Sequence, residues 1–269
     1  MASGAEREVL VVVAHPDDEI LWHSPVLPAA ARILAAFDTT SANAALNEGR
    51  ARVRAQYPLA GFAFLGLLHA EVYSQSDFLS RAPAAYGVTL MRSCPPETAE
   101  LYRSNYDALV RAVDRYVGRH TDIYTHNPWG EYGHEEHIQV HRAMVELAQR
   151  HQCSLWVWDG FPAEELAARD VWMRADYYPD ETLAGVPTTE HDVDLERFRE
   201  IRALYQQEGA WTWSDTYLPP SPSRYLQVVQ DGTVLVTPRR LSPGRRADIA
   251  RQIVSRKARY YAGAARRRI

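Results

Sequence analysis

Six consecutive apolar residues, from Val9 to Ala14, constrain the fold of this chain more than any other segment. The run is rich in Val and does not alternate between apolar and polar residues. This pattern is typical of a strand buried on both faces, as in a parallel sheet that helices cover on both sides. The run therefore predicts an α/β fold in which this strand lies inside the sheet.

The rest of the chain favours the same fold class, because predicted strands alternate with predicted helices. We expect further strands at 33–37, 62–65, 122–125 and 155–158, and helices at 47–57, 97–119, 135–150 and 193–207. Runs at 225–229 and 233–237 flank Asp231–Gly232, a dipeptide that favours a hairpin turn. No internal repeat or low-complexity linker interrupts the sequence, so we expect one domain, with a long irregular connection at 66–96.

Composition and charge argue against several classes of protein function. The chain has 269 residues, 46% of them hydrophobic, and its formal net charge of −4 predicts no nucleic-acid or membrane partner. Cys94 and Cys153 are far apart, so we expect neither a disulfide framework nor a thiolate metal site. The N-terminus does not resemble a signal peptide, and no apolar stretch approaches the ~20 residues that span a bilayer. We therefore expect a soluble, cytoplasmic protein, and the sequence predicts no oligomeric state.

The C-terminal segment 238–269 differs from the rest of the chain in charge. It holds eleven basic residues and a single acid, Asp248. One interpretation is a basic helix that contacts a partner, a membrane or nucleic acid. The alternative is a helix that packs on the acidic body through an apolar side containing Ile249, Ile253 and Tyr260.

Two polar clusters follow predicted strands. The segment HisProAspAspGlu at 15–19 comes directly after the first strand, and HisGluGluHis at 134–137 follows the strand at 122–125 and a Gly-containing loop. In open α/β sheets, ligands bind at the carboxyl ends of the strands. We therefore expect the two clusters to meet in one crevice.

The residue types in these clusters indicate a metal site. A catalytic zinc ion usually has three protein ligands, and His15 and Asp18, three residues apart in a tight turn, point to the same spot. Either His134 or His137 completes the site, and the other polarises a carbonyl or protonates a leaving group. Asp17 then lies beside the metal as a general base. The alternative is a helix N-cap with no metal.

The segments ValValAlaHisProAspAspGlu and GluTyrGlyHisGluGluHis resemble the motifs of the PIG-L/LmbE-like family of zinc-dependent N-deacetylases. The resemblance covers most of residues 8–210. It implies a Rossmann-like three-layer sandwich with a mostly parallel sheet, to which this chain adds a small hairpin and a basic C-terminal helix. The single domain over 1–269 then has a core at about 8–210 and a C-terminal elaboration at 211–269.

The resemblance also implies a reaction and a role for each residue of the site. The reaction is hydrolysis of the N-acetyl group of an amino sugar or an N-acetylglucosamine-containing glycoside, a small-molecule substrate. The implied zinc ligands are His15, Asp18 and His137, and Fe²⁺ is the alternative metal for such a site. The other implied roles are general base for Asp17, oxyanion stabilisation and amine protonation for His134, substrate contact for Tyr132, and holding the catalytic His for Glu136.

One departure from the family motivates a second hypothesis. Trp22 and His23 replace a frequent Gly pair, and we expect them to reshape the floor of the cleft. Since water access decides the outcome at such a site, the same metal centre could serve cyclisation or acyl transfer instead of hydrolysis. A third hypothesis is a non-catalytic module that binds a sugar or a partner.

The sequence leaves two interpretations open for an aromatic segment and for two Arg residues. The aromatic segment 211–217 either stacks against sugar rings or belongs to the core, and Arg50 and Arg54 either bind an anion or lie on a solvated helix face. His141 is expected to pack within its helix. His23, His69, His126 and His191 have no evident partner and are interpreted as surface or core residues.

Overall fold

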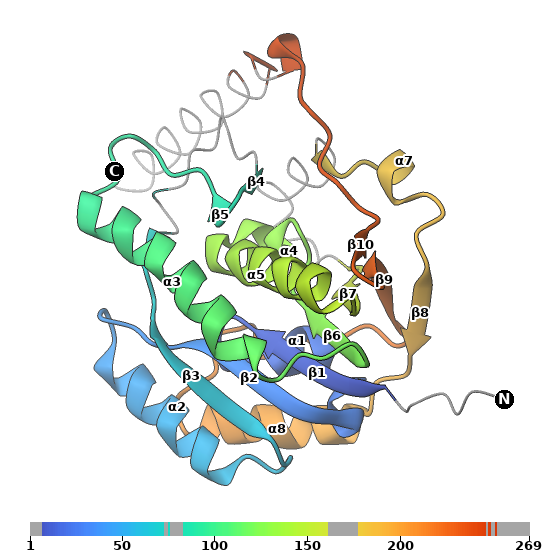
Figure 1. Ribbon diagram of the computed structural model, residues 1–269. Coiled ribbons are helices and arrows are strands. Elements are labelled where there is room, and N and C mark those ends of the chain that lie inside the picture. The colour runs from blue at the N-terminus through green and yellow to red at the C-terminus, as the bar shows by residue number, and fades with distance from the viewer. Residues whose placement is uncertain are drawn as a thin grey trace, which may run out of the picture.

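The computed structural model describes residues 7–72, 75, 83–160, 177–245, 247–248 and 251. A sheet of eight strands lies between two layers of helices (Figure 1). The strands are β1 (Glu8–Val13), β2 (Ala30–Thr39), β3 (Phe62–Leu68), β6 (Thr121–Thr125), β7 (Ser154–Trp158), β8 (Thr188–His191), β9 (Ser223–Gln230) and β10 (Thr233–Val234). A separate pair is formed by β4 (Pro83–Ala84) and β5 (Gly87–Val88).

The strand order β10-β9-β7-β6-β1-β2-β3 places β1 in the middle of the sheet. The five strands from β7 to β3 are parallel, whereas β9 runs antiparallel to β7 and pairs with β8 and β10. The prediction of a mostly parallel α/β sheet is therefore confirmed. The predicted hairpin is confirmed too, with Asp231 at φ 47° and Gly232 at φ 80° in its turn. It belongs to the main sheet, because β9 pairs with β7.

The helices are α1 (Asp18–His23), α2 (Ala44–Gln56), α3 (Pro96–Asp114), α4 (Gly130–Gly133), α5 (Glu135–His151), α7 (Asp180–Leu183) and α8 (Leu195–Gln207), with a 3₁₀ turn at Leu27–Ala29. The helix expected at 97–119 ends five residues earlier, because Tyr116 and Val117 donate to carbonyls three residues back and tighten the chain into the turn before β6. Most of the basic segment 238–269, with its predicted helix, lies outside the described residues.

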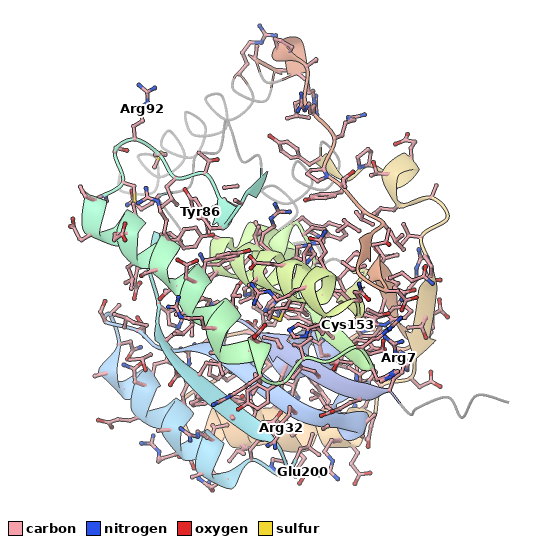
Figure 2. The ribbon with its side chains drawn as sticks, viewed as in Figure 1. Arg7, Arg32, Tyr86, Arg92, Cys153 and Glu200 are labelled. Carbon is pink, nitrogen blue, oxygen red and sulfur yellow. The ribbon has the colours of Figure 1, made fainter. Side chains whose placement is uncertain are left out.

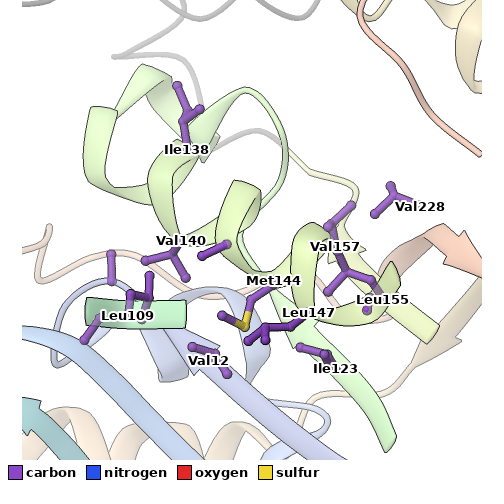
Figure 3. Packing of buried hydrophobic residues seen from close by; sticks show 14 of the residues in the cluster. Val12, Leu109, Ile123, Ile138, Val140, Met144, Leu147, Leu155, Val157 and Val228 are labelled. Atoms are coloured by element: carbon purple, nitrogen blue, oxygen red, sulfur yellow. The ribbon is translucent and has the colours of Figure 1, made fainter. Parts of the chain in front are cut away.

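Alternate residues of β1 enter two different cores. Leu10 and Val12 pack with α3 and α5 on one face, and Val11 and Val13 pack with α1 and α8 on the other. Figure 3 shows the first core, where Met144 and Leu147 of α5 lie over Val12. All four strand residues are at most 1% exposed, which confirms a strand buried on both faces.

The two cysteines are free thiols, both buried, and Cys153 lies inside the molecule at the start of β7 (Figure 2). The expectation of no disulfide is therefore confirmed. Among the described residues, no helix is both long and apolar enough to cross a membrane.

Candidate metal centre and active site

The two polar clusters meet at the carboxyl ends of β1 and β6. These strands are parallel neighbours in register, with Val12 opposite Thr125, so the turn after β1 lies beside the loop after β6. The turn closes through the Asp18 N–H, which donates to the His15 carbonyl at 3.2 Å, and Asp18 then begins α1. His137 reaches the same place from the first turn of α5, as expected from the strand order.

Three ligand atoms from these elements form a compact triangle. His15 Nδ1 lies 3.1 Å from Asp18 Oδ2, Asp18 Oδ2 lies 3.3 Å from His137 Nε2, and the two His atoms are 3.2 Å apart. Zn–N and Zn–O bonds of about 2.0–2.1 Å in a tetrahedral site put neighbouring ligand atoms roughly 3.3 Å apart. The donor types and their spacing therefore fit one divalent ion, and these are the three ligands predicted from the sequence.

A carboxylate holds the other nitrogen of each His in this triangle. His15 Nε2 donates to Glu136 Oε2 at 2.9 Å, and His137 Nδ1 donates to Glu131 Oε2 at 2.7 Å. Metal-binding His residues usually donate their second N–H in this way, which fixes the ring and leaves the other nitrogen for the ion. The arrangement therefore aims His15 Nδ1 and His137 Nε2 at each other and at Asp18.

The charged groups packed around the triangle shift the pKa values of His137 and Asp18. Burial lowers the pKa of His137, but the Asp18 and Glu131 carboxylates outweigh burial and raise the pKa to about 10. Burial alone would raise the pKa of Asp18, yet His137 and His15 hold it well below its usual value. Without a metal ion, His137 is therefore a cation between two carboxylates.

Two further His residues lie in the site, although no partner for them was evident from the sequence. His126 Nε2 accepts the Ala14 N–H at 2.7 Å, so its Nδ1 carries the proton and donates to Glu131. His69 Nε2 lies 3.0 Å from Arg50 Nη1, and its Nδ1 faces Glu136. Both nitrogens of each ring are occupied, so neither His is free to bind the ion, although each belongs to a group with metal-ligand spacing.

Asp17, the residue predicted to be the general base, is held in place by Thr212. It precedes α1 with φ 99°, and its Oδ2 accepts both the Thr212 N–H at 2.9 Å and the Thr212 hydroxyl at 2.7 Å. Burial and the nearby Asp18 carboxylate raise the pKa of Asp17 to about 7, against the effect of Thr212. A carboxylate with a pKa near neutrality suits proton transfer.

His134 stands at the start of α5 and is the helix N-cap. Its Nδ1 accepts the Glu136 N–H at 3.2 Å, and its ring lies against those of His15 and His137, with centroids 4.7 and 4.6 Å away. Burial, together with the charges of His137 and His15, holds the pKa of His134 well below its usual value. His134 is therefore neutral, with its remaining proton on Nε2.

The aromatic segment 211–217 forms a wall of this site. Trp213 is half-buried, with its ring centroid 5.2 Å from that of Tyr132 and 5.5 Å from that of Trp22. Tyr132 in turn lies 5.7 Å from His134. The structure thus brings Tyr132 beside His134 and adds Thr212 and Trp213 from a distant part of the sequence.

Several expectations about neighbouring residues need correction. Trp22 and His23 are buried, at 1% and 0% exposure, so they do not form the floor of an open cleft. Arg50 is buried as well and contacts His69, so it is not on a solvated helix face. Glu136 contacts His134 through its backbone N–H, while its carboxylate binds His15, His69 and the Ala70 N–H.

His141 packs within the core, as predicted. It is 4% exposed, and its Nδ1 lies 2.9 Å from the His126 carbonyl, which ties α5 to the end of β6.

The fold and this donor set define an α/β protein with a candidate mononuclear metal centre at the carboxyl edge of its sheet. A family model described as PIG-L, GlcNAc-PI de-N-acetylase, matches residues 10–148, which is more than half of the chain. The chain therefore belongs to the PIG-L family, as its motifs predicted.

Among solved structures, a deacetylase–teicoplanin complex is 12% identical with a TM-score of 0.48, and covers 82% of this chain and 98% of its own. The antimicrobial reagent A40926 pseudoaglycone deacetylase is 13% identical with a TM-score of 0.43, and covers 84% and 98%. No curated protein sequence matches this chain.

Proposed function

We propose that this protein hydrolyses the N-acetyl group of an N-acetylated amino sugar, or of a glycoside that contains N-acetylglucosamine, with one bound Zn²⁺ ion. Fe²⁺ is the alternative ion. The observation that carries the proposal is the triangle of His15, Asp18 and His137 with Asp17 beside it, in a chain of the PIG-L family. When bound there, the ion supplies Lewis acidity and lowers the pKa of water to about 7.

Asp17 takes the proton of the attacking water in this proposal. Thr212 occupies its Oδ2 with two hydrogen bonds, which fixes the carboxylate and leaves Oδ1 for the proton. The raised pKa of about 7 lets Asp17 release that proton again at neutral pH. We therefore assign protonation of the departing amine to Asp17.

His134 and Tyr132 stabilise the developing oxyanion. The family resemblance implies that His134 protonates the amine, but its Nδ1 already accepts a backbone N–H and its pKa is well below the usual value, so it does not gain a second proton at neutral pH. Its Nε2–H instead donates to the oxyanion, as the Tyr132 hydroxyl does. A preorganised donor of this kind contributes roughly 3 kcal/mol to the transition state.

The half-buried Trp213 and Tyr132 offer ring faces beside the reacting centre. Sugar rings carry apolar C–H faces, so we assign this wall to the substrate and favour a sugar-stacking role over a purely structural one. Cyclisation or acyl transfer loses the observation that motivated it, because Trp22 and His23 are buried.

Two variants distinguish the proposed general base from a proposed metal ligand, because only the loss of a ligand should remove the ion. Asp17→Asn should retain stoichiometric Zn²⁺ and lose about 10²–10⁴-fold in kcat, because the variant cannot accept the proton of water. His137→Ala should lose the ion, and a chelator should inactivate the wild-type protein. The measurements are elemental analysis and the release of free amine and acetate from N-acetylglucosamine and its glycosides.

Asp114→Asn is the matched control, because Asp114 binds Arg150 and His151 on the surface of the molecule. It should behave as wild type. Full turnover by Asp17→Asn would refute the assignment of the base, and amine release without free acetate would refute hydrolysis.

A further inference from the structure

Glu131 has a backbone conformation that a residue with a side chain rarely adopts. It lies between β6 and α5 with φ 52° and ψ −64°, in a segment bounded by Gly130 and Gly133, which also have positive φ. This combination is the strained form of a tight three-residue turn. Strain of this kind persists only where the surrounding contacts hold it, and it gathers at functional sites.

The contacts that hold Glu131 are all hydrogen bonds of a fully buried side chain and its own N–H. Oε1 accepts the Asn127 N–H at 2.9 Å, while the Glu131 N–H donates to Asn127 Oδ1, also at 2.9 Å. Oε2 accepts Nδ1–H of His126 at 2.9 Å and of His137 at 2.7 Å. Three N–H donors therefore converge on one carboxylate.

Only a carboxylate satisfies these three donors together. An amide in its place has one acceptor oxygen, and its NH₂ group would face an N–H. If that NH₂ faced His137, the ring would have to move its proton to Nε2, which is the atom that faces Asp18 and His15. The ionised acid thus determines which nitrogen of His137 is available to a metal ion.

Glu131 also connects the two halves of the centre. It binds His137 of α5 directly, and through His126 it reaches the Ala14 N–H, at the residue before His15. His126 and His137 also stack on each other, with centroids 3.9 Å apart, so a shift of one ring changes the packing of the other.

We propose that Glu131 is a positioning residue of the metal centre, which orients His137 and, through His126, the end of β1 for metal binding. This inference rests on the proposed metal site at His15, Asp18 and His137. The strained turn is retained because it places the carboxylate between the two His rings.

The experiment compares Zn²⁺ affinity in wild type, Glu131→Gln and Glu131→Gly, by competition with a chromogenic chelator. Glycine tolerates the backbone at this position, so the second variant tests the carboxylate without adding strain. Both variants should bind Zn²⁺ about 10–100-fold more weakly than wild type. Glu146→Gln is the control, because the same change on α5 affects only contacts with Tyr106 and Arg150.

Activity in excess Zn²⁺ distinguishes positioning from a general structural role. Once saturated, Glu131→Gln should recover most of its kcat, whereas a misfolded variant would not. Equal Zn²⁺ affinity in wild type and Glu131→Gln would overturn the inference and leave the proposed metal site standing. A wild-type protein that binds no Zn²⁺ would overturn both.

Discussion

At the scale of single residues, the two oxygens of Asp18 have different partners. Oδ2 belongs to the metal triangle and also accepts the His15 N–H at 2.8 Å, whereas Oδ1 accepts the indole N–H of Trp22 at 3.2 Å. Trp22 is 1% exposed and packs against Trp158, with centroids 5.0 Å apart. The indole therefore holds Asp18 so that a single oxygen faces the proposed metal site.

Trp22→Phe tests this function of the indole. The variant keeps an aromatic ring in the core and removes the N–H, so Asp18 should lose its fixed orientation and Zn²⁺ should bind about tenfold more weakly. Chelator competition measures the change. Trp158→Phe, in the same aromatic cluster, should keep wild-type affinity, and a similar loss in both variants would show that packing rather than the hydrogen bond is responsible.

The sequence revealed the site residues whose roles follow from strand geometry or from the family motifs, and missed those whose contacts form only in the folded chain. His15, Asp17 and Asp18 are neighbours after one apolar run, so their convergence followed from strand geometry. Glu131 is the first residue of the second motif, but its role was missed because it depends on rings that only the folded loop brings together. His126 carried a partial signal, since it follows the strand that pairs with β1.

At the scale of elements, a close approach of α2 to the end of α8 supports the active-site wall. A Cβ on Gly49 of α2 would lie 2.4 Å from the Glu208 carbonyl oxygen. Glu208 follows α8 and precedes the segment that carries Thr212, the residue that binds Asp17. The position of Asp17 therefore depends on the contact between α2 and the end of α8.

Gly49→Ala should destabilise the protein by about 1–3 kcal/mol, because the backbone of Glu208 must move to admit the methyl group. It should also lower kcat, since the shift reaches Thr212 and Asp17. Urea unfolding and acetate release measure the two effects. Gly118→Ala is the control, because its nearest neighbour would be Thr121 Oγ1 at 4.0 Å, and destabilisation of equal size there would contradict the packing argument.

Elements with long apolar patterns were predictable, and those that depend on pairing were not. The central strands and the main helices appear within a few residues of their expected bounds, apart from the early end of α3. The polar strand β8, ThrThrGluHis at 188–191, has no apolar pattern and exists because it pairs with the edge of β9. Local sequence does not contain that information.

At the scale of the whole molecule, folding concentrates charge in the centre of the protein. Burial opposes the positive charge of His15 and His137, but the carboxylates around them raise the pKa of both. In the metal-free fold His137 therefore carries a proton on Nε2, the atom that faces the proposed metal site, so protons and a metal ion compete there. Above neutrality, the stability of the metal-free protein should then fall as pH rises, whereas the stability of the Zn²⁺-bound protein should change little.

The pKa of His137 determines whether metal-free stability rises or falls with pH. This pKa is about 10 in the folded chain, against an ordinary value of 6.5 that applies to the unfolded chain. The contribution of His137 to metal-free stability is complete below pH 6.5 and is lost as pH rises toward 10. Zn²⁺ binding releases this proton, so Kd falls about tenfold per pH unit and the stabilisation by a fixed Zn²⁺ concentration grows by about 1.4 kcal/mol per unit.

Thermal unfolding at about pH 6.5 and about pH 8.5, with Zn²⁺ and with chelator, measures this gain. The Tm difference between the two forms should be larger at the higher pH. In Glu131→Gly, which lacks one of the two carboxylates facing His137, the dependence on pH should be weaker because the proton is held less tightly. A Tm difference that is the same at both pH values in the wild type would mean that the ion does not displace the His137 proton, and would exclude His137 as a ligand.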